Sequence, residues 1–162
     1  MMTLNRTAGP GFIFMKRQNL GEIVTASLSD RQIRRLIADD AFEVRAALSR
    51  NPNPPGWARD RLALDSSARV RQSLLWQYPE LPAQVVLAVI DQYGTADVES
   101  GELSRQRFAP RELRESRFAD EFSDWEIRDV MDQRQLSGDA MATVMARRSE
   151  HLTLRELLDQ AT

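Results

Sequence analysis

The chain has 162 residues, of which 42% are hydrophobic and 28% are charged, and its formal net charge is −2. This composition is typical of an ordinary folded protein, and the small net charge excludes a strong whole-molecule attraction to nucleic acid or to an acidic membrane surface. The sequence has no cysteine and one histidine, His151. It therefore lacks a disulfide framework, a thiol nucleophile and any metal site built on cysteine or on two or more histidines.

The charges are distributed unevenly along the chain. Lys16 is the only lysine among the 22 basic residues, and the remaining arginines carry planar groups that suit carboxylates, phosphates and aromatic faces. A genome that prefers arginine codons would give the same bias. Residues 1–80 contain 12 basic and 8 acidic residues, whereas residues 81–162 contain 10 basic and 16 acidic ones. Such an asymmetry can mark a partner surface at one end of the molecule.

Residues 1–20 show no periodicity and contain the breaker cluster Gly9-Pro10-Gly11. We therefore expect a flexible or loosely packed segment over residues 1–20 and a single domain over residues 21–162. No signal peptide is recognisable, and the longest apolar run, Val85 to Ile90, is too short to span a bilayer. The expectation is a cytoplasmic protein.

Capping boxes, prolines and a glycine delimit the helices that we expect from residue 29 onward. A capping box satisfies the free N–H groups at a helix start. Pro55 is expected to be the first residue of a helix, where no N–H is needed, and Gly94 provides a C-terminal stop. The helices predicted between these signals cover residues 43–50, 57–64, 69–77, 83–93, 98–104 (short or irregular) and 139–147. Others open at three capping boxes, which start at Ser29, Ser123 and Thr153, and after Pro110.

Two sets of landmarks recur with a fixed period. The helix openers are 27, 28 and 28 residues apart, at Pro55, Pro82, Pro110 and Gly138. The apolar anchors are 26, 28, 29 and 27 residues apart, at Val44, Val70, Val98, Ile127 and Leu154. A period in this range is typical of a solenoid, in which each unit buries its apolar face against its neighbours. Because each unit has two helical stretches and no strand-like alternation, the sequence predicts an all-α solenoid of about five two-helix repeats.

The best-preserved copies of the repeat resemble a known family. The pattern D-x4-V-R-x2-L-x3-P-x2-P, read from Asp39 to Pro55, is similar to the leucine-rich repeat variant, a bacterial member of the HEAT-like group. The resemblance covers residues 29–94 well, 123–162 moderately and 95–122 poorly. It implies a right-handed superhelix of alternating α-helices and short 3-10-like helices. Some members carry an iron–sulfur cluster on a cysteine-rich segment, but this chain has no cysteine, so no cofactor is carried over.

Acidic and basic residues recur at equivalent places in the repeat. An arginine follows the buried anchor directly in four copies, and an aspartate precedes the first two of these arginines by six residues. We expect them to join neighbouring repeats, and the alternative is that the arginines are presented to a ligand. At Glu99 the arginine is missing, which predicts a local break. Hereafter the Asp/Arg series means Asp39, Arg45, Asp65, Arg71, Arg128 and Arg155.

A second group of residues is predicted to face a partner. Arginines on one short helix align, by repeat register, with Trp57 and Arg61 on the next one, and arginine and tryptophan often dominate interface energetics. An arginine-rich run extends from Arg105 to Arg117. The alternatives are that Trp57 covers the proline turn and that the run is a solvated helix face. The predicted partner surface consists of Arg31, Arg34, Arg35, Trp57, Arg61, Arg111 and Arg114.

The two other tryptophans are predicted to have structural roles. Trp76 lies before the turn at Tyr78-Pro79, and aromatic packing on proline explains it. Trp125 follows a capping box and is predicted to staple the helix or to contact a neighbouring repeat.

Three functions remain open at this point. The first is a non-catalytic protein-interaction module, and one concrete form of it is an inhibitor or immunity-type protein. It is favoured because HEAT-like folds mostly bind proteins and because the sequence holds no catalytic constellation. The second is nucleic-acid binding, with arginines on phosphates and Trp57 stacking on a base. A remote third, implied by the DNA glycosylases among HEAT-like proteins, is an enzyme using Trp57 and Asp60. We expect no metal and no cofactor, and the oligomeric state is left open.

Overall fold

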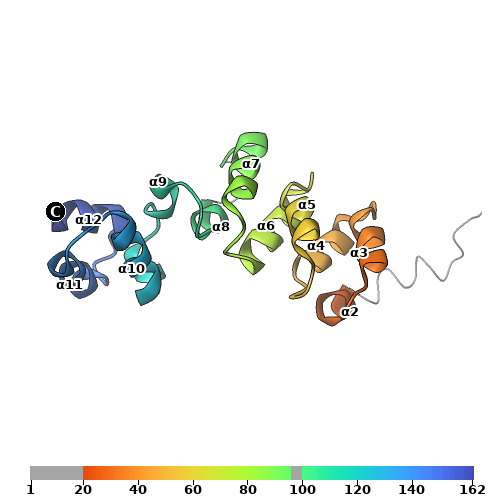
Figure 1. The fold of residues 1–162 in the computed structure, drawn as a ribbon, viewed down its shortest axis with the longest axis horizontal. Coiled ribbons are helices and arrows are strands. Elements are labelled where there is room, and N and C mark those ends of the chain that lie inside the picture. The colour runs from red at the N-terminus through yellow and green to blue at the C-terminus, as the bar shows by residue number, and fades with distance from the viewer. Residues whose placement is uncertain (1–19, 96–99) are drawn as a thin grey trace, which may run out of the picture.

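The computed structural model describes residues 20–95 and 100–162, and in these ranges it is all-helical, as predicted (Figure 1). It has 11 α-helices and one 3-10 helix there, and an isolated bridge between Phe118 and Thr153 is the sole β-type pairing among the described residues. No helix within them is long and apolar enough to cross a membrane. The segment predicted to be loosely packed lies outside the described residues, except for Leu20.

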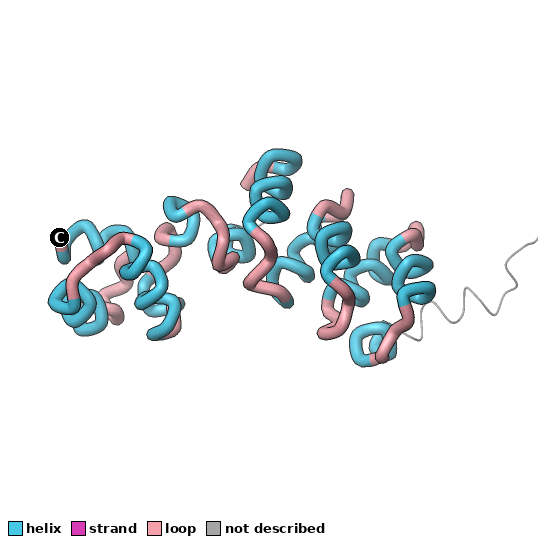
Figure 2. The backbone as a smooth tube through the Cα atoms, viewed as in Figure 1, coloured by secondary structure: helices cyan, strands magenta, loops and turns pink. Residues whose placement is uncertain are grey.

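The helices follow one another in chain order along the long axis of the molecule, and short loops connect them (Figure 2). Most of the bounds agree with the predicted ranges to within two residues, whereas α2 was not predicted. The elements are α2 (Leu20–Thr25), α3 (Asp30–Ile37), α4 (Phe42–Ser49), α5 (Gly56–Ala63), α6 (Ala68–Gln77), α7 (Ala83–Tyr93), α8 (Ser100–Ser104), α9 (Arg111–Arg114), η1 (Ala119–Glu121), α10 (Asp124–Gln133), α11 (Gly138–Arg147) and α12 (Leu154–Ala161).

All three predicted capping boxes are present. At the start of α3, the backbone N–H of Ser29 donates to the Gln32 side chain over 2.8 Å, and the Ser29 hydroxyl accepts from the Gln32 N–H. The same reciprocal pairs open α10 and α12, where a glutamate replaces the glutamine. Each box satisfies N–H groups that a helix start would otherwise leave without a partner.

Each of the three helix-opening prolines is an N-cap. We expected Pro55 to be the first residue of a helix, but it is the N-cap of α5, with an extended backbone at φ −64° and ψ 161°. Its carbonyl accepts from the N–H of Ala58 over 3.0 Å, and Pro82 and Pro110 start α7 and α9 in the same way. The N-cap position needs no donor, so the missing N–H of proline costs nothing there. Gly94, at φ +67°, ends α7 as predicted.

Three polar side chains link a turn to residues about one period earlier, and a fourth, Arg134, links its turn to Glu115, 19 residues earlier. Asn51 donates to the carbonyls of Ile23 and Ala26 over 2.6 and 2.8 Å, and the Tyr78 hydroxyl donates to the carbonyl of Asn51. The buried Gln106 side chain donates to two carbonyls of the turn before it, over 2.7 and 2.9 Å. Each of these residues precedes a helix opener by four positions. Hereafter the turn donors are Asn51, Tyr78, Gln106 and Arg134.

The buried apolar side chains form two clusters. The first extends from Ile33 to Ala109 and is built mainly by α3 to α7, and the second extends from Ala119 to Leu158 and is built by η1 and α10 to α12. Burial of apolar surface supplies most of the stabilisation of each cluster. The prediction of a single domain over residues 21–162 stays a prediction. Within this range, the buried core of the described residues is divided into two clusters.

Buried charged groups occupy the segment between the two clusters. Arg114 donates to Asp129 over 3.0 Å, and Arg134, the fourth turn donor, forms a bidentate pair with the buried Glu115. Backbone contacts add to these pairs, since the N–H of Leu154 donates to the carbonyl of Arg117 over 2.9 Å. We call three ion pairs together the charged junction: Arg114–Asp129, Arg134–Glu115 and Arg117–Glu126. In the last pair, Nη1 of Arg117 and Oε1 of Glu126 are 3.4 Å apart.

Candidate binding surface

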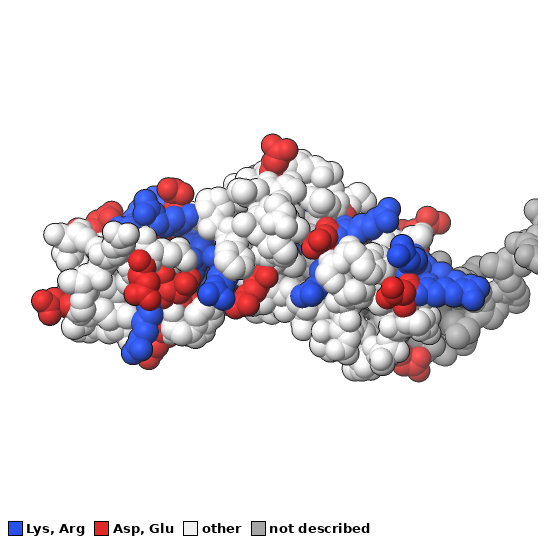
Figure 3. Space-filling model, in the orientation of Figure 1, with Lys and Arg blue, Asp and Glu red and all other residues white. Residues whose placement is uncertain are grey.

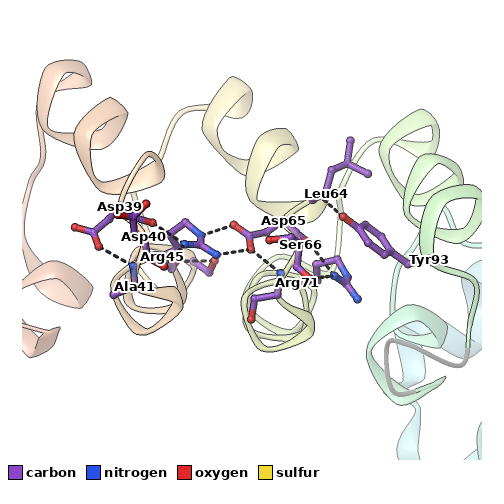
Figure 4. Close-up of polar contacts among 11 residues, drawn as sticks. Asp39, Asp40, Ala41, Arg45, Leu64, Asp65, Ser66, Arg71 and Tyr93 are labelled. Carbon is purple, nitrogen blue, oxygen red and sulfur yellow. Dashed lines mark hydrogen bonds and ion pairs between the residues drawn. The ribbon is translucent and has the colours of Figure 1, made fainter.

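The Asp/Arg series is realised in the first two copies of the repeat pattern (Figure 4). Arg45 forms a bidentate pair with Asp65, with Nε–Oδ2 and Nη2–Oδ1 distances of 2.7 and 3.1 Å. Its Nη1 donates to the carbonyl of Asp39 over 2.6 Å, while the Asp39 carboxylate accepts from the N–H of Ala41. The hydrogen bonding of Arg45 to the Asp65 carboxylate is the main reason that the pKa of Arg45 is raised. Arg45 therefore joins two segments that are 20 and 6 residues away.

Tyr93 replaces the aspartate in the third copy. It lies six residues before Glu99, as Asp65 lies six before Arg71. Arg71 keeps its bond to the carbonyl of Asp65 over 2.7 Å, but its guanidinium stacks 3.6 Å from the centre of the Tyr93 ring instead of pairing with a carboxylate. The Tyr93 hydroxyl donates to the carbonyl of Leu64 over 2.8 Å (Figure 4). The break predicted at Glu99 lies outside the described residues, and the change of partner occurs already at Tyr93.

Arg128 and Arg155 do not continue the series, which corrects the prediction for both. Arg128 is exposed, and its side chain has no hydrogen bond or ion pair with any residue that the structure describes. The residue 20 positions after it, where Arg45 finds Asp65, is Arg148, which itself donates to the carbonyl of Phe122. Arg155 donates to the carbonyl of Glu112 over 2.6 Å. Neither arginine has a carboxylate partner among the described residues, so the pairing of Arg45 with Asp65 is not repeated in these copies.

The strongest candidate surface lies where α3 packs against α5. The Arg34 guanidinium stacks 4.5 Å from the centre of the Trp57 ring, and both residues line a depression of about 410 Å³ together with Arg61. Trp57 is half-buried and packs against the first cluster, because Leu62 and Ala63 of the same helix point into the core. The depression thus has a rigid aromatic wall that carries a guanidinium group.

Of the arginines predicted on this surface, Arg34 and Arg61 line the depression, whereas Arg31 and Arg35 are not among its lining residues. Within the ranges that the structure describes, none of Arg31, Arg34, Arg35 and Arg61 forms an ion pair, and all four are exposed. Asp65 also lines the depression, but Arg45 already occupies both of its oxygens. Figure 3 shows basic side chains projecting at the end of the molecule that α3 forms. Guanidinium groups without partners favour an anionic ligand.

The predicted partner surface does not form one continuous site. Arg111 and Arg114 lie on α9, away from α3 and α5 along the molecule (Figure 1). Arg111 is exposed there, but Arg114 is only 4% exposed and pairs with Asp129. Placing Arg114 on the surface was therefore wrong, because the helical spacing of the run could not reveal that α10 would cover one of its members.

Sequence reasoning missed two features. The turn donors have different side chains, so no residue type recurs in the sequence to reveal them. Trp76 and Trp125 received structural roles, yet they are 60% and 54% exposed. The sequence feature that could have pointed to their exposure is their position on either side of the irregular segment 95–122.

The described residues include one histidine, several acidic side chains and no cysteine. They contain no group of three or more His, Cys, Asp or Glu that could hold a metal ion. His151 stacks on Phe118 at a ring distance of 4.2 Å and lies at the surface. No family model, curated protein or solved structure matches the chain.

Proposed function

We propose that the chain is a non-catalytic protein-binding module built as a HEAT-like α-solenoid of the leucine-rich repeat variant type. Two recurring sets of contacts support a repeated architecture. The turn donors recur after 27, 28 and 28 residues, as the helix openers do, and the first members of the Asp/Arg series join adjacent copies. Nearest-neighbour contacts of this kind are what hold a solenoid together.

The observation that carries the binding proposal is the surface formed by Arg34, Trp57 and Arg61. Trp57 supplies a fixed aromatic surface, and the surrounding arginines have no described carboxylate to pair with. A partner protein with an acidic face would supply those carboxylates, and charge complementarity would speed its association. An inhibitor or immunity-type role, in which the module covers an active surface of its partner, is one concrete form.

Nucleic acid is the second candidate, because the same arginines also suit phosphates. Two observations make it the weaker one. Arg34 already covers one face of Trp57, which leaves less of the ring for stacking on a base, and the formal net charge of the chain is −2. A glycosylase-like enzyme ranks third, since Asp60 is not among the residues that line the depression around Trp57.

Affinity capture with paired variants tests this proposal. We expect the wild-type chain, in extract treated with nuclease, to retain a protein that the double variant Arg34→Gln/Arg61→Gln loses. Arg128→Gln is the matched control, because it removes an exposed arginine on α10 that is not part of this depression and has no described partner. If nuclease removes the bound material, or if the double variant retains the same protein as the control, the proposal is wrong.

A further inference from the structure

A second groove opens at the charged junction, away from Trp57. It has a volume of about 320 Å³, and α6 and its following turn supply one wall while α10 supplies the other. Trp76 and Trp125 stand on these two walls and are 60% and 54% exposed. Figure 3 shows charged side chains of both signs between α8 and α10 on the visible face. Two large aromatic side chains thus remain in solvent beside one groove, an arrangement that marks interaction sites.

One positive charge in this groove is left without a described partner. Arg107 pairs with Glu80 over 3.4 Å, and Arg114 is held by Asp129. Arg105 stacks 4.5 Å from the centre of the Trp76 ring and makes no hydrogen bond or ion pair with the residues that the structure describes. Its guanidinium group therefore keeps its donors free for a ligand.

The acidic side chain on the opposite wall does not cancel this charge. Glu126 accepts from the backbone and the hydroxyl of Ser123 over 2.8 Å, and it also lies 3.4 Å from Arg117. Its carboxylate is thus committed to the capping box of α10 and to the charged junction. The groups left for a ligand in the groove are the hydrogen-bond donors of Arg105, the ring face of Trp76 that Arg105 does not cover, and the Trp125 ring.

These groups specify the ligand. An indole N–H and a guanidinium group only donate hydrogen bonds, so the ligand must supply acceptors, among them a carboxylate for Arg105. The exposed indole faces and Pro79 offer apolar surface, which suits apolar side chains next to that carboxylate. Because both tryptophans are more than half exposed, the groove is open, and an open groove suits a chain that passes through it better than an enclosed metabolite.

We propose that this groove binds an extended peptide segment of a partner protein, in which an acidic residue lies between apolar ones. The carboxylate pairs with Arg105, and the apolar neighbours pack on Trp76 and Trp125. Because these tryptophans belong to opposite sides of the charged junction, a bound peptide holds the two apolar clusters together. The groove is separate from the Trp57 surface, so this inference does not depend on the function proposed above.

The three tryptophans provide a direct readout, since the chain has one at the first surface and two at the groove. Proton–nitrogen spectra of the labelled protein contain one indole signal for each, and single Trp→Phe variants assign them. The probe is an acetylated and amidated peptide that alternates Glu with Pro and Leu. We expect it to shift the signals of Trp76 and Trp125 together and to leave that of Trp57 in place.

Two controls make the result specific. A peptide with Lys in place of Glu should bind weakly, and Arg105→Gln should weaken the Glu peptide by about ten-fold, which is the usual effect of losing a charged hydrogen bond. Arg128→Gln should leave the affinity unchanged. The inference is overturned if the peptide shifts no signal, if it shifts Trp57 alone, or if the Glu and Lys peptides bind equally. A shift of Trp57 alone would instead favour the surface proposed above, so the two proposals fail separately.

Discussion

Arg45 uses each of its three guanidinium nitrogens, and its partners come from two different turns. Nε and Nη2 hold the Asp65 carboxylate, whose side chain is only 9% exposed, and Nη1 holds the carbonyls of Asp39 and Asp40. A lysine could not satisfy this arrangement, because an ammonium group lacks the planar fork that matches a carboxylate. The arginine at this place is therefore a structural residue.

Replacing Arg45 tests this role. Arg45→Gln should lower the free energy of unfolding by about 3 kcal/mol, since it leaves the largely buried Asp65 carboxylate without its partner. Urea denaturation measures the change. Arg128→Gln serves as the control and should change stability by less than about 0.5 kcal/mol, because its side chain is exposed. Equal effects of the two substitutions would show that the Arg45 pair contributes little.

At the scale of the helix, the capping boxes differ in how they respond to pH. The box of α3 uses Gln32, which does not titrate, whereas the boxes of α10 and α12 use Glu126 and Glu156. Burial alone would raise the pKa of Glu126, but hydrogen bonds from Ser123 and the charge of Arg117 lower it below the ordinary value of 4.5. The backbone hydrogen bond from Thr153 lowers the pKa of Glu156.

Acid should therefore weaken the start of α10 more than that of α3. A carboxylate whose pKa is lowered by folding stabilises the protein above its unfolded pKa, and this contribution is lost as the pH falls through the folded pKa. We expect the urea midpoint of the wild type to fall more than that of Glu126→Gln between about pH 7 and pH 3.5. Gln32→Glu should make the urea midpoint depend more strongly on pH than in the wild type, because it places a titrating carboxylate in the capping box of α3. An identical loss in the wild type and in Glu126→Gln would contradict this account.

At the scale of the whole molecule, apolar packing holds each of the two clusters together, whereas charged groups lie between the clusters. The two apolar clusters share no buried member, and the charged junction lies between them. Ion pairs in such places depend on the presence of both partners and contribute less than apolar packing of the same volume. The molecule should therefore open locally in two parts, although the chain connecting them is short.

Matched core substitutions test this division. Leu74 belongs to the first cluster and Leu158 to the second, and both are fully buried. Each Leu→Ala change should cost about 2–5 kcal/mol within its own cluster. Hydrogen exchange read by mass spectrometry should then show faster exchange in α4 to α7 for Leu74→Ala and in α10 to α12 for Leu158→Ala. Equal loss of protection in both parts, for either variant, would show that the chain unfolds as one unit.

The sequence by itself determined most of the helices and their starts, because these depend on local chemistry. A capping box is closed by residues three apart, as at Ser29 and Gln32, and a proline or glycine restricts its own backbone whatever surrounds it. The pairing of Arg45 with Asp65 was also within reach, since a fixed period brings equivalent positions together.

Only the tertiary structure decided which side chains are covered. Arg114 and Arg111 have the same local signals, yet α10 buries the first and leaves the second in solvent. Trp76 and Trp125 look like packing residues, but the charged junction separates their helices and leaves both indoles exposed beside one groove. Burial depends on contacts between segments far apart in the chain, and a single sequence does not contain the geometry that brings those segments together.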